Sequence, residues 1–321
     1  ENLLMYNHET GYTSNISIWP EANSGRGIKE LKYRFQWTYP IVISPHNPNI
    51  LYAAGNHVLR SNNSGHSWEE ISPDLTRNDQ SKMEPSGRPI TIDTTSAEYY
   101  CTIFALSESP QQPGVLWAGS DDGLVHISED HGKTWKEITP KDLPAWSQVN
   151  TIELSTHHHG TAFISATRYK LNDNRPYLYK TTDFGKTWKG IVQGIPQNDF
   201  TRVIREDLER PGLLYVGTES GLYISYNQGS SWERIPDKRG SDHSHNLPVV
   251  PVYDIVVKDQ ELVVATHGRS FWILDNLALV RQLDEDQEDN EVHLFKPADS
   301  YLIPSPQGPS RKHSYQYSTA P

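Results

Sequence analysis

Short runs rich in apolar and β-branched residues recur along the chain, separated by turns rich in Gly, Pro, Asn and Asp. Such runs predict β-strands. Four sets of four runs lie at residues 37–44, 50–54, 58–61 and 69–72; at 102–108, 115–119, 124–128 and 136–139; at 149–155, 162–167, 177–181 and 189–192; and at 202–206, 213–217, 222–225 and 233–235. Units of four strands over roughly 40–50 residues predict an all-β propeller with four-stranded antiparallel blades.

Both ends of the chain depart from this repeat. Residues 2–17 predict a hairpin, which we interpret as the tail of a blade whose start is missing. A fifth set keeps only three strands, at 253–258, 261–266 and 270–275. Residues 277–283 predict a short helix. The predicted division has three parts. Residues 1–276 form a propeller segment, and residues 277–304 form a closing or linking segment. Residues 305–321, rich in Pro, Ser and Tyr, form a linker toward an absent C-terminal region.

An eight-residue pattern, Ser/Thr-x-Asp/Asn-x-Gly-x-Ser/Thr-Trp, lies between the third and fourth strands of each complete set, and we call it the box. Its Asp or Asn starts a tight turn, and its Gly supplies a backbone conformation with positive φ. Its Trp is expected to be largely buried between neighbouring blades. The predicted structural residues are Asn63, Trp68, Asp130, Trp135, Asp183, Trp188, Asn227 and Trp232. The box identifies a fold but does not identify a reaction.

The box resembles the Asp-box of BNR-repeat β-propellers. Together with residues 33–37, 96–100 and 267–275, it resembles a large group of exported bacterial BNR-repeat proteins, which are similar to the sortilin propeller and often labelled glycosyl hydrolases. The resemblance covers nearly all of residues 1–300 and implies a secreted, periplasmic or cell-surface location. It also implies further blades, so the chain is expected to be one piece of a larger propeller. Related xyloglucan hydrolases place a catalytic Asp on each of two propellers, but their local motifs are not matched here.

Composition narrows the classes of partner. The chain carries 40 acidic against 29 basic residues, a net charge of −11, which argues against a nucleic-acid partner. A single cysteine, Cys101, excludes a disulfide within the chain. No run of eighteen apolar residues exists, so no membrane span is expected. No signal peptide is visible. Because Glu1 is not an initiator methionine, we expect that the natural protein has residues upstream of Glu1 that this sequence lacks.

Candidate binding residues follow from strand direction. Loops that precede strand one and loops that join strands two and three share one end of a propeller, which we call the top face; the boxes lie at the opposite end, the box face. The top-face loops carry acids, arginines and aromatics, including Tyr100, Trp146, Gln148 and Tyr169. The predicted ligand-binding residues are Tyr33, Arg34, Glu98, Tyr99, Asp121, Arg168, His267 and Arg269.

Several of these residues have an alternative, structural interpretation. Residues 121–123, Asp-Asp-Gly, suit a tight turn. Glu98 suits a buried partner for an arginine, and His267 and Arg269 suit bonds to loop carbonyls. No metal or cofactor is expected, because the side chains of residues 157–159, three consecutive histidines, diverge in a turn and no cysteine pair exists.

Two functions of different classes remain. The first is an extracytoplasmic propeller whose top face binds a peptide, protein or glycan. The second is a glycoside hydrolase, xyloglucanase-like or sialidase-like, that uses two top-face carboxylates, with Glu98 and Asp121 as the catalytic candidates. In either case we expect the remaining blades of the propeller, or a self-association partner, to cover the open ends of the segment.

Overall fold

The computed structural model describes residues 3–21, 27–85, 99–235, 247–283 and 294–297. Strands dominate this part of the chain. Helical structure in it is confined to one turn of α-helix, α1 (Leu277–Val280), and to three 3-10 turns, η1 (Ile28–Glu30), η2 (Gln80–Lys82) and η3 (Tyr169–Leu171). No helix in the described ranges is long and apolar enough to cross a membrane.

The chain forms a β-propeller segment of four four-stranded sheets, as the repeat predicts. Blade 1 contains β3 (Ile41–Ile43), β4 (Leu51–Ala54), β5 (Val58–Ser61) and β6 (Glu69–Glu70); blade 2 contains β7 (Ile103–Glu108), β8 (Leu116–Ser120), β9 (Val125–Ser128) and β10 (Lys136–Glu137). Blade 3 contains β11 (Gln148–Leu154), β12 (Ala162–Arg168), β13 (Asp173–Thr181) and β14 (Lys189–Gly190); blade 4 contains β15 (Thr201–Glu206), β16 (Leu214–Thr218), β17 (Leu222–Ser225) and β18 (Glu233–Arg234).

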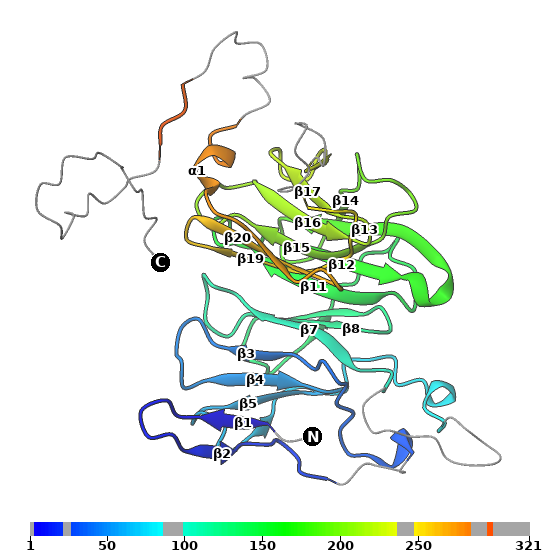
Figure 1. Cartoon of the computed structure of the whole chain (residues 1–321). Coiled ribbons are helices and arrows are strands. Elements are labelled where there is room, and N and C mark those ends of the chain that lie inside the picture. Colours follow the sequence, from blue (N-terminus) through cyan, green and yellow to red (C-terminus); the bar gives the residue numbers. More distant parts are fainter. Residues whose placement is uncertain (1–2, 22–26, 86–98, 236–246, 284–293, 298–321) are drawn as a thin grey trace, which may run out of the picture.

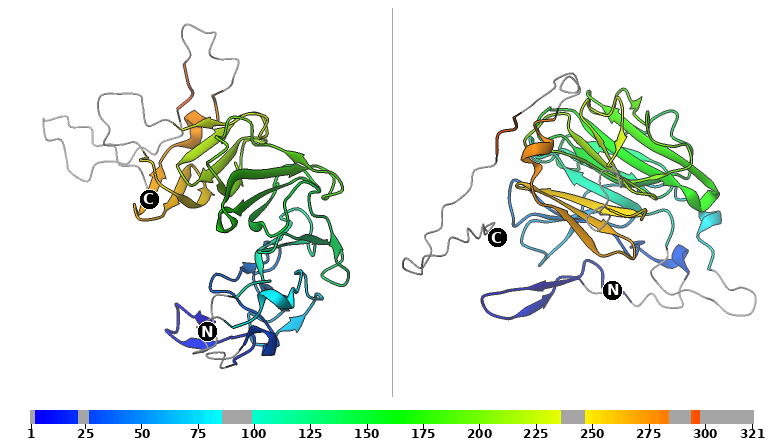
Figure 2. Two further views of the ribbon diagram at one scale, coloured as in Figure 1. Left: turned by 90° about the vertical axis from the view of Figure 1, so that its right-hand side faces the viewer. Right: turned by 45° about the horizontal axis from the view of Figure 1, so that its top comes forward.

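The terminal sheets are smaller. Blade 5 contains β19 (Val252–Lys258), β20 (Glu261–Thr266) and β21 (Phe271–Leu274), and a separate hairpin pairs β1 (Leu4–Tyr6) with β2 (Thr13–Asn15). The sheets follow one another as stacked layers (Figure 1). Seen from the end that carries η3, they form a crescent from the hairpin to blade 5 (Figure 2, left).

The hydrophobic core is divided into layers between consecutive blades. One layer joins blades 2 and 3 through Trp117, Val149 and Ile164, and a similar layer joins blades 4 and 5. In blades 2 and 4 the second strand carries a glycine, Gly119 or Gly217, where the first strand of the next blade approaches. A Cβ on Gly119 would lie 2.5 Å from Cγ1 of Val149, so only glycine permits this spacing. Each blade therefore buries its apolar faces against its neighbours.

The boxes form the predicted turn and reach across to the preceding blade. In blade 2, Asp130 Oδ1 accepts a 2.9 Å hydrogen bond from Thr134 N, and Oδ2 accepts one of 2.6 Å from Thr134 Oγ1. These bonds lower the pKa of Asp130 to about 2. Trp135 Nε1 donates a 2.8 Å hydrogen bond to the Ile71 carbonyl oxygen at the end of blade 1. The other three box tryptophans make the equivalent bond to Ile16, Ile138 and Ile191.

The expectation that the box tryptophans are largely buried is met fully by one of them and in part by the other three. Trp232 is 3% exposed, whereas Trp68, Trp135 and Trp188 are half-buried. Trp135 and Trp188 pack against the core layers between blades but stay partly exposed, so we place them at the rim of the interface. The indole N–H of a box tryptophan, and not only its apolar area, therefore links the blades.

The boxes share one end of the molecule with the turns between strands one and two. In blade 3, Phe184 N of the box donates a 3.0 Å hydrogen bond to the carbonyl oxygen of Gly160 in that turn. Blades 2 and 4 repeat this bond through His131 to Gly114 and Gln228 to Gly212. The box face is therefore at the left of Figure 1, and η3 on the β12–β13 connection marks the top face at the right.

Most strands lie within two residues of their predicted bounds, and the exceptions have local causes. β3 covers only Ile41–Ile43 rather than residues 37–44, because Pro40 and Pro45 flank it. Residues 169–175, which lie between two predicted strands, form η3 and the start of β13, where Asp173 Oδ2 accepts a 2.7 Å hydrogen bond from Tyr177 Oη. The final strand of each four-stranded blade has two residues.

Both ends of the crescent expose apolar side chains. On blade 5, Val256 and Ile273 flank Val263 in register and are 48% and 54% exposed. On blade 1, Ile41 and Ile43 are 48% and 62% exposed. Beside blade 1, the Ile16 carbonyl oxygen next to the hairpin accepts the hydrogen bond of Trp68, as the end of a preceding blade does elsewhere. In the described residues no inner strands accompany the hairpin. These two faces are open sheet surfaces of the kind that further blades cover.

The burial difference between box tryptophans gives a graded stability prediction. We expect Trp232→Ala to lower the free energy of unfolding by about 3–5 kcal/mol, because it leaves a cavity in a closed interface. Trp135→Ala should cost less, about 1–3 kcal/mol, because it removes a rim contact and one hydrogen bond. Denaturant unfolding followed by far-ultraviolet circular dichroism measures both. Equal effects would show that the rim position does not matter.

Candidate functional site

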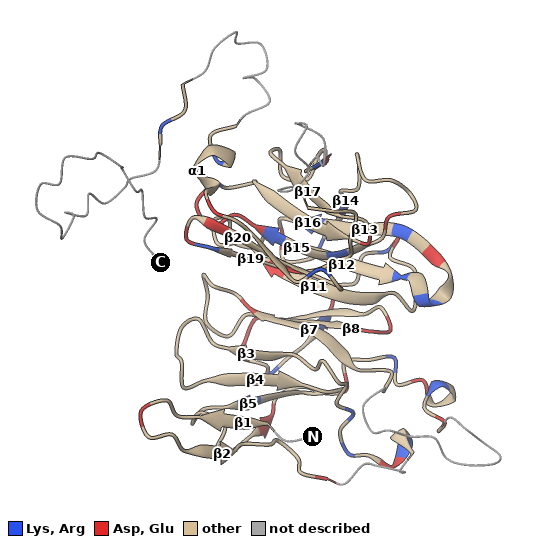
Figure 3. Cartoon of the chain, in the orientation of Figure 1, with Lys and Arg blue, Asp and Glu red and all other residues tan. Residues whose placement is uncertain are grey.

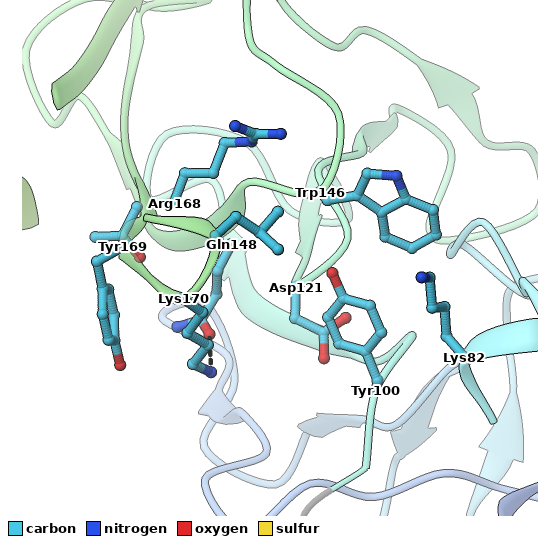
Figure 4. A pocket seen from close by; sticks show the side chains of 10 residues that line it. Lys82, Tyr100, Asp121, Trp146, Gln148, Arg168, Tyr169 and Lys170 are labelled. Atoms are coloured by element: carbon cyan, nitrogen blue, oxygen red, sulfur yellow. Dashed lines mark hydrogen bonds between the residues drawn. The ribbon is translucent and has the colours of Figure 1, made fainter. Parts of the chain in front are cut away.

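A cavity of about 250 Å³ opens on the top face between blades 2 and 3 (Figure 4). It is built by η2, by the loops before β7 and β11, by the turn after β8 and by η3. The lining side chains that matter chemically are Lys82, Tyr100, Asp121, Trp146, Gln148, Arg168, Tyr169 and Lys170. We call it the Trp146 cavity. It thus gathers residues from segments far apart in the sequence, as predicted for top-face loops.

One wall of the Trp146 cavity is a pair of stacked rings. Tyr100 and Trp146 have centroids 5.6 Å apart and planes 22° from parallel. Lys82 Nζ lies 5.8 Å from the Trp146 ring centroid, within cation–π range. The Trp146 backbone has φ of +67°, an unusual conformation for a bulky residue, and its N–H donates to the Asp122 carbonyl oxygen at 3.1 Å. The turn of blade 2 thus holds Trp146 in a strained position, as is frequent at ligand sites.

Asp121 is the carboxylic acid of this cavity. It is 3% exposed and accepts hydrogen bonds from Thr102 N at 2.9 Å and Thr102 Oγ1 at 2.8 Å. Burial raises its pKa to about 7, against the opposing effect of these bonds. The same acid and burial raise the pKa of Tyr100. Asp121 therefore exists in both protonation states near neutral pH.

Cationic side chains line the side opposite the rings. Lys170 Nζ donates to Gln148 Oε1 at 3.0 Å. Arg168 contacts Asp173 at 3.4 Å, but that carboxylate is held more closely by Arg175, through bonds of 2.9 and 2.8 Å. The Arg175 bonds lower the pKa of Asp173, which remains ionised. One carboxylate is thus shared by two guanidinium groups, and this end of β12 and β13 keeps a positive charge.

The concave side of the crescent forms a wide channel of about 1100 Å³ along the innermost strands. Glu153, Arg205 and Asp254 lie on three consecutive strands of its wall, β11, β15 and β19. Arg205 contacts Asp254 at 2.8 Å and Glu153 at 3.6 Å. Burial raises the pKa of Glu153 to about 7, partly offset by Arg205. This ion cluster was not anticipated, because nothing in a strand sequence marks which outward side chain faces a channel.

The predicted ligand-binding residues that lie in the described ranges divide into three groups. Asp121 and Arg168 meet in the Trp146 cavity. His267 and Arg269 are exposed on blade 5, where the His267 ring stacks on Tyr253 at 4.9 Å. Glu98 lies outside the described residues.

The third group lies inside the protein rather than on the opening. Arg34 is 6% exposed, and its side chain donates to the Cys101 carbonyl oxygen at 3.0 Å and to Asp74 at 2.6 Å. Tyr99 packs in a buried cluster with Met83. Tyr33 Oη donates to Glu70 on the outer strand of blade 1 at 2.9 Å, far from the innermost strands. We therefore leave these three residues out of the candidate site.

Lys82 and Lys170 are cavity residues that the sequence did not single out. Tyr100, Trp146, Gln148 and Tyr169 were placed in the correct loops but not separated from other top-face residues. Trp146 carries one usable signal: it is an aromatic residue outside any box that directly precedes a first strand.

The three consecutive histidines lie in the box-face turn of blade 3, as expected. His157 Nε2 lies 2.8 Å from the Asp207 carbonyl oxygen, and the His159 ring packs edge-on against Phe184 at 4.9 Å. Within the described ranges, no group of three His, Cys, Asp or Glu side chains could hold a metal ion. His243 and His245, in a later loop, lie outside those ranges.

Comparison with known proteins relates the chain to propellers with different functions. No known family profile matches it. It is 28% identical over 198 residues to a probable oligoxyloglucan-reducing end-specific xyloglucanase of Neosartorya fischeri. The aligned region covers 59% of this chain and 23% of that protein. It is 25% identical over 114 residues to sortilin of Rattus norvegicus, covering 35% of this chain and 13% of sortilin. The chain thus spans about a quarter or less of these curated relatives.

Solved structures support the fold. The GH74 xyloglucanase from Xanthomonas campestris superposes with a TM-score of 0.53 at 16% identity, over 74% of this chain and 36% of that one. An ancestral GH74 enzyme gives a TM-score of 0.50 at 15% identity, over 80% of this chain and 32% of that one. At these identities the likeness shows the β-propeller fold alone.

The pKa of Asp121 gives a prediction with a definite sign. Because folding raises this pKa from 3.8 to about 7, the folded state binds the proton more tightly, and stability should fall as pH rises through this range. Asp121→Asn removes this dependence. Its stability relative to the parent chain should therefore rise by roughly 2–4 kcal/mol between acidic and mildly alkaline pH. Denaturant unfolding across pH measures the difference.

Asp130→Asn is the matched control, because the pKa of Asp130 is lowered on folding. This variant should change the stability profile only at the acid end, with the opposite sign. An Asp121→Asn profile parallel to that of the parent chain would contradict the assignment.

Proposed function

We propose that this chain is the ligand-binding part of an extracytoplasmic β-propeller, and that its top face binds a peptide, protein or glycan in the Trp146 cavity. The observation that carries the proposal is the combination of stacked rings, one buried acid and several cations in one cavity. Rings with a polar rim offer large contact area, and convergent charged groups orient what binds.

The proposed location and partners rest on the box pattern and on the open sheet faces. The resemblance of the boxes to exported repeat proteins supports a secreted, periplasmic or cell-surface site. The apolar faces at Val256 and Ile273, and at Ile41 and Ile43, support contact with further blades of the same propeller or with a second copy. We also retain the division into a propeller segment, a closing segment and a linker as a proposal.

Glycoside hydrolysis is the second candidate, and the pKa of Asp121 favours it. A carboxyl group with a pKa near 7 can donate a proton to a leaving oxygen at neutral pH. Two curated relatives are described as oligoxyloglucan-reducing end-specific xyloglucanases. Hydrolysis needs a second carboxylate, and among the described lining residues of the cavity Asp121 is the only acid. Glu98 therefore remains the proposed second carboxylate. A sialidase-like site would need several arginines on the top face, and Arg34 cannot be one of them because its side chain is buried and bonds Asp74.

Trp146→Ala tests the binding site directly. We expect it to weaken binding by about 2 kcal/mol or more, the scale of a central aromatic contact. Ligands would be found on an array of glycans and peptides, and affinities measured by calorimetry. Tyr12→Ala is the control, because Tyr12 is an exposed aromatic on the β1–β2 hairpin. Binding that survives Trp146→Ala unchanged would place the ligand elsewhere.

Asp121→Asn separates the two candidate functions. A binder should keep most of its affinity and show no turnover of glycans in either form. A hydrolase should lose activity while its fold, followed by circular dichroism, stays intact. Turnover that persists in Asp121→Asn would remove Asp121 as the acid.

A further inference from the structure

We propose that the ligand is an extended anionic glycan, and that it runs from the Trp146 cavity across η3 into the channel. This inference rests on the proposed function and adds a ligand class and a second subsite to it. The second subsite lies at the channel mouth and consists of Tyr169, Phe200, Arg202, Tyr253 and His267. We call it the Arg202 subsite.

The two cavities share a wall. Gln148, Tyr169 and Lys170 line both the Trp146 cavity and the channel. The Lys170–Gln148 hydrogen bond lies on this shared wall, and Tyr169 is 37% exposed. Figure 4 shows Lys170 and Tyr169 pointing away from the stacked rings, on the far side of Gln148. A ligand bound against Trp146 can therefore continue across η3 without entering the protein core.

Aromatic rings continue on the channel side. Tyr169 stacks on Phe200 at 4.9 Å with planes 13° apart. The guanidinium carbon of Arg202 lies 4.9 Å from the Phe200 ring and 4.0 Å from the Tyr253 ring, and Glu219 fixes it through bonds of 2.9 and 2.5 Å. Tyr253 is 46% exposed, and the His267 ring stacks on the Tyr253 ring. Phe200 is only 6% exposed and lies behind Tyr169, so the accessible flat faces are those of Tyr169 and Tyr253 on neighbouring blades. Two such faces suit successive flat units of a chain.

Bonds between the innermost strands favour a glycan over a peptide. An added peptide strand needs free backbone acceptors on a sheet edge. Here side chains of the preceding blade already occupy several of them. Ser107 Oγ donates to the Ile152 carbonyl oxygen at 2.8 Å, Thr151 Oγ1 to that of Arg202 at 3.3 Å, and Arg205 Nε to that of Ile255 at 2.9 Å.

Local charge in the Trp146 cavity favours an anionic chain there, whereas the channel lining is balanced, with Lys170, Arg202 and Arg205 against Glu108, Glu153 and Asp254. The whole protein has a net charge of −11, yet the described lining residues of the Trp146 cavity include Lys82, Arg168 and Lys170 against Asp121 alone. Figure 3 shows Lys and Arg on the β12–β13 connection at the right of the view. Cations that converge in a cavity of an acidic protein attract an acidic ligand and reject others.

The experiment uses galacturonic acid oligomers, from monomer to hexamer, and their methyl-esterified counterparts. Affinities are measured by calorimetry on the whole chain at low and high salt. We expect affinity to rise by about tenfold or more from monomer to hexamer, because only longer chains reach both subsites. Esterification and added salt should each weaken binding of the hexamer.

Two variants test the two parts of the proposal. Tyr253→Ala should lower hexamer affinity to that of short oligomers and leave short oligomers unaffected. Lys170→Gln should weaken the hexamer by roughly three- to tenfold and reduce the salt dependence. Lys186→Gln is the matched control, since Lys186 is an exposed lysine in the box of blade 3, at the opposite end. It should change neither quantity.

Several outcomes overturn the inference while the proposed function stands. These are equal affinity for monomer and hexamer, equal affinity for esterified chains, no effect of Tyr253→Ala, or preference for an acidic peptide at the same site. Failure to bind the oligomers, with another ligand still lost in Trp146→Ala, also overturns it. If no ligand on the array depends on Trp146, the proposed function itself fails.

Discussion

The hydrogen bond from a box tryptophan to the preceding blade is the interaction on which the rest of the structure depends. It recurs four times, from Trp68, Trp135, Trp188 and Trp232 to a carbonyl oxygen of the neighbouring sheet. A blade alone has two apolar faces and lacks the carbonyl acceptor that the neighbouring blade offers to its indole N–H. The apolar faces of a blade are buried only when another blade lies beside it. Stacking is therefore a requirement of the repeat itself, and it sets the spacing and angle at which the loops meet.

A second set of contacts joins the blades at the inner edge, through Ser107, Thr151 and Arg205. Between blades 2 and 3, and between blades 3 and 4, a box tryptophan and a polar side chain at the channel hold the two blades at two separated points. Little variation is possible on the box face, because each box also binds the adjacent turn of its own blade. On the top face a backbone bond also recurs, from Asp121 to Thr102, Glu219 to Phe200 and His267 to Pro251, but it lies next to the strand ends and leaves the rest of each loop free to differ. Insertions such as η2 and η3 are accommodated there, and the cavity is built from them.

This division explains what the sequence could and could not predict. The boxes and strands repeat, so their positions, the blade number and the two faces follow from pattern alone. Loops before the first strands do not repeat. Arg34 and Tyr99 were assigned to the opening by loop position, but the chain turns them inward, where Arg34 bonds Asp74 and Tyr99 joins the cluster around Met83. Whether a loop side chain points into a cavity or into the core depends on long-range packing that no local pattern encodes.

The Asp-Asp-Gly turn of blade 2 shows why structural and functional interpretations of one motif need not compete. Asp122 is fully buried, and its carbonyl oxygen accepts hydrogen bonds from Arg77 Nε and from the Trp146 N–H. Asp121 receives only the two donors of Thr102 and faces the cavity, so burial leaves its pKa near neutrality. The same tight turn thus holds the aromatic wall with one residue and presents an acid with the other. The cavity chemistry is thus a consequence of how the turn between β8 and β9 is anchored.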